Sequence, residues 1–268
     1  MKLLAILIAF GVFHSLRKPA ALQSFSWWHI WLSLGSRMNW LKPRALRQAL
    51  LLLIPVLLVG WMAYLLNTWH DHQLWYLLFN CVVLYYCLGP EQLEITAAEI
   101  SAEDGPSEES PDSSASLQWL VNTLINEAIS RWFLVVFWFV VLGAAGALLS
   151  RLLDEMLSQQ TNQDSWLNRG RELLSYPVIW LMILSLLVAS DFDRIWRHCK
   201  RYLKQQNWYR QHRALLYEAM DFAVENCEID DYQSDDFKTV RRTTLSVLKR
   251  MLMVWLVMVA FSVIFTIG

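Results

Sequence analysis

The chain has 268 residues, of which 56% are hydrophobic and only 18% are charged. Soluble globular domains carry about one quarter charged residues, so this composition excludes a largely disordered chain and argues against a simple soluble enzyme. The net charge of −1 gives no general attraction to nucleic acid, and we predict no nucleic-acid partner. Fifteen Trp and twelve Phe residues are typical of a protein in contact with membrane interfaces.

Six apolar runs that contain no Asp, Glu, Lys or Arg organise the chain. Five of them, with their flanking residues, approach the ~20 residues that cross ~30 Å of hydrocarbon, and the first is shorter and resembles an uncleaved anchor. We therefore predict an all-α, multi-pass membrane protein, a single membrane domain over 1–268 with about five or six transmembrane helices. Pro55 falls inside a run, where proline is tolerated if a neighbouring group satisfies the carbonyl that it frees. The predicted spans are 3–13, 49–66, 74–88, 132–149, 176–190 and 251–267.

Three segments between the runs have distinct compositions. Segment 14–48 combines aromatic and basic residues with no acid, which is typical of an interfacial helix on anionic lipid. Segment 91–116 is acidic and contains Gly, Pro and Ser, so it is predicted to be a flexible linker. Segment 191–250 shows two amphipathic patterns and is predicted to form a cytoplasmic helical hairpin.

Basic residues between the runs predict an orientation. With six alternating spans, nineteen Lys and Arg lie on one side and four on the other. Because positive residues concentrate in the cytoplasm, we expect both termini outside it. Arg131 and Arg151 then lie at opposite faces, since twenty residues of one straight helix extend about 30 Å.

Motifs for catalysis are absent from the sequence. It contains no phosphate-binding glycine loop, no HExxH and no GxSxG, so we predict no catalytic residue and no cofactor. His70 and His72 flank Asp71 without a distant third ligand, and we predict no metal site, although metal binding at this pair stays open. With no CxxC motif, the four cysteines are interpreted as free thiols.

Charged residues near the ends of two runs form the first predicted binding group, which is Glu127, Arg131, Asp191 and Asp193. Glu127 and Arg131 have i, i+4 spacing, and Arg131 would face a carboxylate if the two helices are neighbours. Charges at membrane depth are expensive unless paired, so such a group suggests a small cytoplasm-facing groove. The alternative is that these residues anchor separate helix ends at the headgroups.

A second candidate group lies around the end of the run 132–149. Arg151 and Asp154 have i, i+3 spacing and are predicted to pair. Gly143 and Gly146 are predicted to form a helix contact, because small residues let membrane helices approach closely. Charged caps at a helix end are again the alternative.

The stretch from Arg131 to Arg151, RWFLVVFWFVVLGAAGALLSR, resembles the AmpE family of bacterial inner-membrane proteins, which is linked to regulation of β-lactamase induction. The stretches YYCLGP at 85–90 and SDFD at 190–193 are similar as well. The resemblance implies a multi-pass protein of the bacterial inner membrane that acts as a sensor or signalling modulator of cell-wall status. It implies the lipid bilayer and other inner-membrane proteins as partners, with an unknown ligand.

The AmpE family is in turn similar to the CobD/CbiB membrane proteins, which form an amide in cobalamin biosynthesis. Of the motif that follows the arginine in that family, only Asp154 is retained here, within Leu152-Leu153-Asp154-Glu155. The alternatives to a signalling modulator are therefore a membrane-embedded amide-forming enzyme and a structural partner of other membrane proteins. We expect a protein that is not an enzyme.

Overall fold

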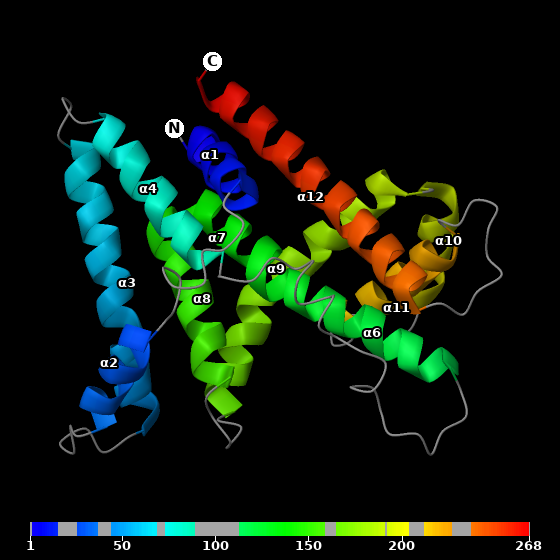
Figure 1. The fold of residues 1–268 in the computed structure, drawn as a ribbon, viewed down its shortest axis with the longest axis horizontal. Coiled ribbons are helices and arrows are strands. Elements are labelled where there is room, and N and C mark those ends of the chain that lie inside the picture. Colours follow the sequence, from blue (N-terminus) through cyan, green and yellow to red (C-terminus); the bar gives the residue numbers. More distant parts are fainter. Residues whose placement is uncertain are drawn as a thin grey trace. The chain divides into compact units, whose positions relative to one another are not determined.

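The computed structural model describes nine ranges of the chain, all essentially helical (Figure 1). No strand occurs within these ranges, so the predicted all-α class is confirmed. In the described part, four stretches are long and apolar enough to cross a membrane, fewer than predicted: Ala45–Thr68, Leu117–Leu142, Trp166–Ala189 and Lys238–Phe261. The described ranges are 2–15, 26–36, 44–68, 73–88, 113–158, 165–190, 192–203, 212–226 and 237–267.

The chain forms two compact units, and the single membrane domain over 1–268 stays a prediction. Unit 1 comprises residues 1–90 and 130–174, and unit 2 comprises residues 91–129 and 175–268. Each unit therefore draws on two separate parts of the chain.

In unit 1, α4 is the central helix. It contacts α1, α3, α7 and α8, while α3 also contacts α8 and α2 packs on α3. Figure 1 shows α3 and α4 as neighbouring helices joined at one end, with α1 beside α4. The elements of unit 1 are α1 (Lys2–Ser15), α2 (Ser26–Ser36), α3 (Arg44–Thr68), α4 (Gln73–Cys87), most of the π-helical turn η3 (Ile129–Phe133), α7 (Leu134–Leu142), α8 (Ala144–Ser158) and the beginning of α9 (Ser165–Ala189).

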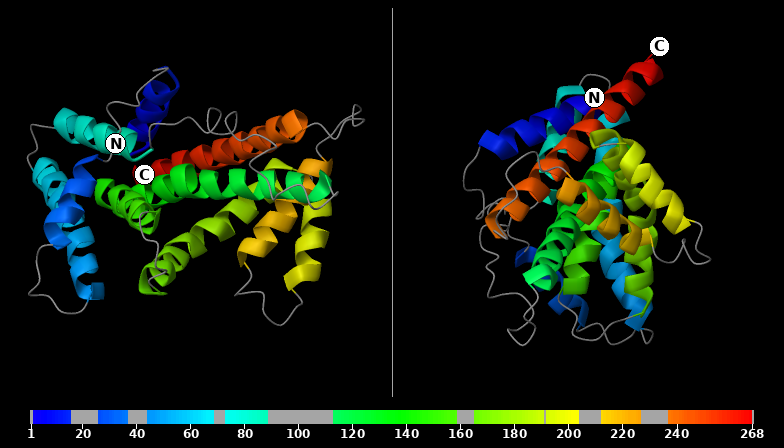
Figure 2. Two further views of the ribbon diagram at one scale, coloured as in Figure 1. Left: turned by 60° about the horizontal axis from the view of Figure 1, so that its bottom comes forward. Right: turned by 90° about the vertical axis from the view of Figure 1, so that its right-hand side faces the viewer.

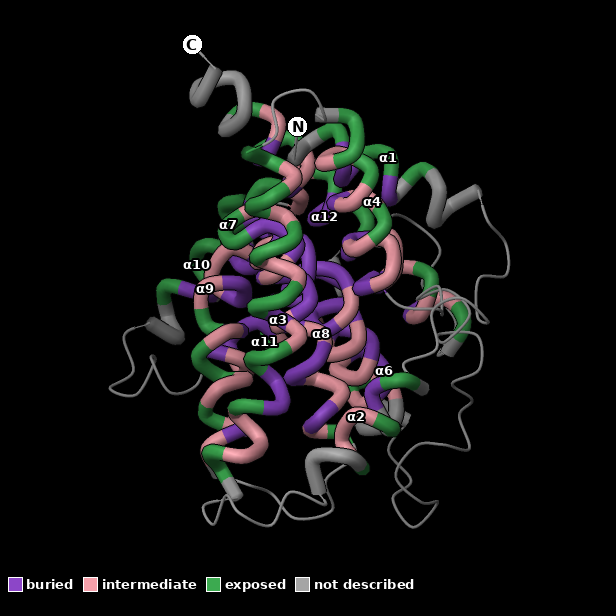
Figure 3. Tube along the Cα trace, turned by 90° about the vertical axis from the view of Figure 1, so that its left-hand side faces the viewer, coloured by how far each residue is buried: buried purple, intermediate pink, exposed green. Residues whose placement is uncertain are grey.

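Helix α3 presents apolar side chains that no part of the described structure covers. Leu57 is 67% exposed and Trp61 is 65% exposed, and Figure 3 shows exposed residues recurring along α3. A soluble protein rarely leaves so continuous an apolar surface in water, whereas a helix with all its backbone bonds internal is stable in lipid. These residues support a location in a membrane.

Pro55 interrupts the hydrogen bonding of α3 without ending the helix. Proline has no N–H, so the carbonyl four residues earlier, at Leu51, loses its helical donor. The indole Nε1 of Trp31 on α2 donates to this Leu51 oxygen at 3.0 Å. The packing of α2 on α3 thus supplies the neighbouring donor that the sequence analysis required for an internal proline.

Unit 2 is a helical assembly in which α11 contacts α6, α10 and α12. Helices α6 and α12 lie side by side (Figure 2). The elements are α6 (Ser113–Ala128), residues 175–189 of α9, α10 (Phe192–Leu203), α11 (His212–Asn226) and α12 (Phe237–Ile267).

Several helices extend beyond the predicted spans and segments. Helix α9 begins at Ser165 and α12 at Phe237, well before the predicted spans 176–190 and 251–267. Of the predicted hairpin 191–250, α10 and α11 do contact each other, but residues 237–250 belong to α12. Of the predicted linker 91–116, residues 113–116 are already helical and the remainder lies outside the described residues. In each case an apolar run continues into polar residues that also form helix.

Candidate functional site

The run 132–149, predicted to be one straight helix, is divided at Gly143. Helix α7 ends at Leu142 and α8 begins at Ala144. Gly143 has φ of 74°, a conformation that favours glycine, and its N–H donates to the Phe139 oxygen at 2.8 Å. Beyond this turn α8 packs back along α7. The prediction of a single helix is therefore wrong, because hydropathy does not detect a turn between two apolar segments.

Two glycines, Gly146 and Gly60, allow the helices around this turn to approach closely. A Cβ added at Gly146 would collide with the carbonyl oxygen of Trp138 on α7, whereas one added at Gly143 would meet nothing within 4 Å. Of the two glycines predicted to form a helix contact, Gly146 makes one between α8 and α7, while Gly143 forms the turn. Gly60 on α3, which the sequence analysis missed, would place a Cβ 3.4 Å from the Cβ of Ala145.

Because α8 runs back along α7, side chains from three elements meet in unit 1. The Oγ of Ser130 on η3 donates to Oδ1 of Asp154 on α8 at 3.3 Å. Nη2 of Arg171 on α9 lies 3.3 Å from the same carboxylate oxygen and donates to the Ser130 Oγ at 3.1 Å. We refer to this closed triangle as the Ser130–Asp154–Arg171 cluster.

The cluster corrects the predicted positions of residues 131 and 151. A bond between Ser130 and Asp154 is incompatible with placing the two ends of this segment at opposite membrane faces, about 30 Å apart. Ser130 lies near the middle of the apolar stretch Leu117–Leu142. If that stretch crosses the bilayer, the ion pair lies close to its centre, where charged side chains usually have a function.

The cluster is partly accessible. The side chains of Arg171 and Asp154 are 33% and 23% exposed, and Ser130 is buried. Both described contacts of the guanidinium use Nη2, and an arginine has five N–H donors in a planar fork. The remaining donors are suited to a carboxylate or phosphate group, to which arginine binds through two parallel hydrogen bonds.

Within the described residues, Asp154 pairs with Arg171 and not with Arg151, its predicted partner. Elsewhere in unit 1, the Tyr86 hydroxyl accepts a hydrogen bond of 2.6 Å from Nε1 of Trp27. The i, i+3 spacing in the sequence predicted Arg151 as the partner of Asp154. The observed partner, Arg171, lies on a different helix, α9.

The first predicted group remains a prediction. Glu127 is half-buried at the end of α6, Arg131 is half-buried in η3, and Asp193 is exposed in the first turn of α10. The backbone oxygen of Asp193 accepts a hydrogen bond of 3.1 Å from Nε of Arg197. Asp191 lies outside the described residues.

A second polar feature of unit 1 is a cavity of about 190 Å³ beside the α7–α8 turn, between α3 and α4. Asn80, which is 2% exposed, lines it together with Tyr64, Asn67 and Tyr76. Nδ2 of Asn80 donates to the Tyr76 backbone oxygen at 2.8 Å, but its Oδ1 has no hydrogen-bond partner among the described residues. A buried acceptor of this kind is normally satisfied by water or a polar ligand.

Polar contacts in unit 2 connect helices. The Tyr217 hydroxyl on α11 donates to Oδ1 of Asn126 on α6 at 2.6 Å. Nη2 of Arg213 on α11 donates to Oγ of Ser175 on α9 at 3.2 Å. These bonds fix α11 against its neighbours, and the sequence analysis singled out none of them.

Metal-binding and thiol chemistry have little basis in the described part of the chain. No three His, Cys, Asp or Glu residues are grouped there to hold a metal ion, and His70 and His72 lie outside the described ranges. Cys199 on α10 is a free thiol, and burial raises its pKa above the ordinary value of 9.0. The chain matches no protein-family model, no curated protein and no solved structure.

Proposed function

We propose that this protein is an AmpE-like inner-membrane modulator that links cell-wall status to β-lactamase regulation, with the Ser130–Asp154–Arg171 cluster as its ligand-responsive element. The observation that supports the cluster's role is the meeting of a carboxylate, a guanidinium and a hydroxyl from three separate elements. The link to β-lactamase comes from the sequence resemblance of the stretch 131–151.

The cluster is suited to switching because its bonds are mutually dependent. Asp154 accepts from both partners, so an anion that recruits Arg171 competes directly with the carboxylate. The side chains of Arg171 and Asp154 are partly exposed, so an anion has access to the pair that it would replace. Release of Arg171 would loosen α9 from α8, which is a structural change that a partner protein can detect.

The test uses induction in the host bacterium. The gene is deleted and then complemented with the wild type, Arg171→Gln or the matched control Arg169→Gln, which removes an exposed arginine from the same helix. We expect the deletion to change the β-lactamase response to inducer. The wild type and Arg169→Gln should restore the original response, whereas Arg171→Gln should not. An unchanged response after deletion, with each protein verified in the membrane fraction, would contradict the proposal.

A second candidate function is amide formation, as in the CobD/CbiB family. It is favoured by one observation: Asp154, the residue retained from that family's motif, is the centre of the cluster. An enzyme of this kind would give growth that depends on supplied cobalamin after gene deletion, with restoration by the wild type but not by Asp154→Asn. Cobalamin-independent growth of the deletion strain would reject this alternative and leave the signalling role.

A further inference from the structure

The first turns of α12 carry a group of basic residues that the proposed function does not use. They surround a hollow of about 410 Å³ in unit 2. Four of the six lining residues are cationic and none is acidic, so the hollow attracts anions. We refer to it as the α12 basic hollow, and it is lined by Lys238, Arg241, Arg242, Leu245, Ser246 and Lys249.

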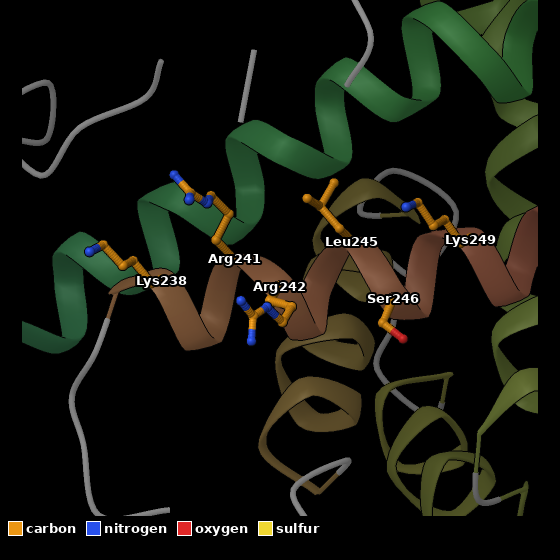
Figure 4. Close-up of a pocket in the computed structure, with 6 residues that line it drawn as sticks. All are labelled: Lys238, Arg241, Arg242, Leu245, Ser246 and Lys249. Carbon is orange, nitrogen blue, oxygen red and sulfur yellow. The ribbon is translucent and has the colours of Figure 1, made fainter. Parts of the chain in front are cut away.

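The helix places these charges along one surface. Lys238, Arg241 and Lys249 follow the spacing of residues on one helix face, and Figure 4 shows Arg241 and Lys249 projecting above α12 in the view, with Arg242 and Ser246 projecting below it. Lys238, Arg242 and Lys249 are exposed, and Arg241 is half-buried. The cationic residues therefore line an accessible space along three turns of helix.

The length of α12 places the hollow at a defined depth. Its 31 residues extend about 46 Å, which is more than the ~30 Å of a hydrocarbon core. No charged residue occurs in 251–267, so this end is the part suited to hydrocarbon. If 251–267 fills the hydrocarbon core, the basic turns at the start of the stretch Lys238–Phe261 lie in the headgroup layer at one face of the bilayer, where phosphate groups are concentrated.

We propose that the α12 basic hollow binds the phosphate group of an anionic phospholipid headgroup. Arginine binds phosphate through paired N–H groups, and Arg242 provides such a fork on the same side of α12 as the Ser246 hydroxyl, while Lys238, Arg241 and Lys249 add positive charge to the lining. Leu245 supplies an apolar surface between them for the glycerol and the start of the acyl chains. A zwitterionic lipid carries the same phosphate, but its ammonium group is repelled by the surrounding cations.

A soluble phosphate compound offers the same chemistry, and the depth of the hollow favours the lipid. Binding is measured by native mass spectrometry of the detergent-solubilised full chain with added phosphatidylglycerol or phosphatidylcholine. Competition with inorganic phosphate and with glycerol 3-phosphate, each added to the phosphatidylglycerol complex, distinguishes the two sources of phosphate.

The test variant is Arg241→Gln/Arg242→Gln, and the matched control is Arg197→Gln/Lys200→Gln, which removes two exposed charges from α10 in the same unit. Each basic residue near an anionic lipid strengthens binding about fivefold. We expect the apparent Kd for phosphatidylglycerol to rise about 25-fold in the test variant and to change less than about twofold in the control. Wild-type protein should prefer phosphatidylglycerol to phosphatidylcholine.

Three results would overturn the proposal. Equal binding of phosphatidylglycerol and phosphatidylcholine would show that the protein has no headgroup preference. Equal losses of affinity in the test and control variants would indicate a general electrostatic attraction between the protein and the lipid, without a specific site. Displacement of phosphatidylglycerol by millimolar inorganic phosphate or glycerol 3-phosphate would assign the hollow to a soluble ligand. If the double arginine variant does not fold, as judged by its melting curve, Lys238→Gln/Lys249→Gln provides the same comparison at exposed positions.

Discussion

The hydrogen bond from Trp31 to the Leu51 carbonyl provides a sharp test of the packing between α2 and α3. Its 3.0 Å length is within the normal range, and Leu51 is buried, so water does not readily replace the donor. Trp31→Phe removes the N–H and keeps an aromatic ring. We expect this change to destabilise the protein because a buried acceptor loses its partner.

The magnitude follows from the position of Pro55. A buried acceptor left without a partner costs about 1–3 kcal/mol, and hydrogen bonds between membrane helices average about 0.6 kcal/mol. In a Pro55→Ala background, residue 55 has an N–H that can donate to the Leu51 oxygen. Trp31→Phe should therefore cost about 1 kcal/mol less in that background than in the wild type.

The assay is a double-mutant cycle of unfolding free energies in mixed micelles with increasing denaturing detergent. Trp28→Phe is the matched control, because Trp28 is fully buried on the same helix and its Nε1 has no hydrogen-bond partner among the described residues. Its effect should be the same with Pro55 or Ala at position 55. If the effects of Trp31→Phe and Pro55→Ala were simply additive, the satisfied carbonyl would not explain how α3 accommodates its proline.

Further predictions concern the α7–α8 turn, the cluster and the buried thiol. Gly146→Ala should destabilise the protein by about 1–3 kcal/mol through collision with the α7 backbone, whereas Gly60→Ala should have a smaller effect; equal melting temperatures for the two variants would contradict the packing described. Asp154→Asn and Arg171→Gln should be non-additive by about 0.5 kcal/mol or more in unfolding free energy, and additivity would mean that the two side chains do not pair. Because burial raises the pKa of the Cys199 thiol above its ordinary value of 9.0, the folded protein should react with iodoacetamide more slowly than free cysteine near neutral pH. The stabilisation from the buried neutral thiol is complete below pH 9.0 and is lost as the pH rises through the folded pKa; reaction at the rate of free cysteine would refute the burial.

The sequence predicted the class of fold because long apolar runs are a direct physical requirement of membrane helices. The run 49–66 lies within α3 much as expected. The turn at Gly143 was missed because α7 and the start of α8 are both apolar, so hydropathy is continuous across it. The glycine itself was the available signal, and it was interpreted as a helix contact.

The candidate site was predicted only in part. Asp154 was identified from local spacing, but its partner Arg171 lies on another helix, and such a pairing has no signature in residues three or four positions apart. Ser130 was missed because a serine inside an apolar helix usually bonds its own backbone. Ser130 and Asp154 come together only because the chain turns at Gly143, and the hydropathy pattern does not show that turn.

The π-helical turn η3 gives this part of the chain an unusual tolerance for changes in length. A π-helical turn contains one more residue than an α-helical turn and commonly occurs near functional residues. Removing one residue from Ile129–Phe133 would allow an ordinary α-helical turn to form in its place, so the helix itself would survive. The flanking helices would keep their register, however, while residues within the turn would change direction, so we expect Ser130 no longer to face α8. We expect such a deletion to retain the helical circular dichroism of the wild type and to lose the coupling between Asp154 and Arg171. A change of length at η3 can therefore alter the direction of a side chain while the helix stays intact.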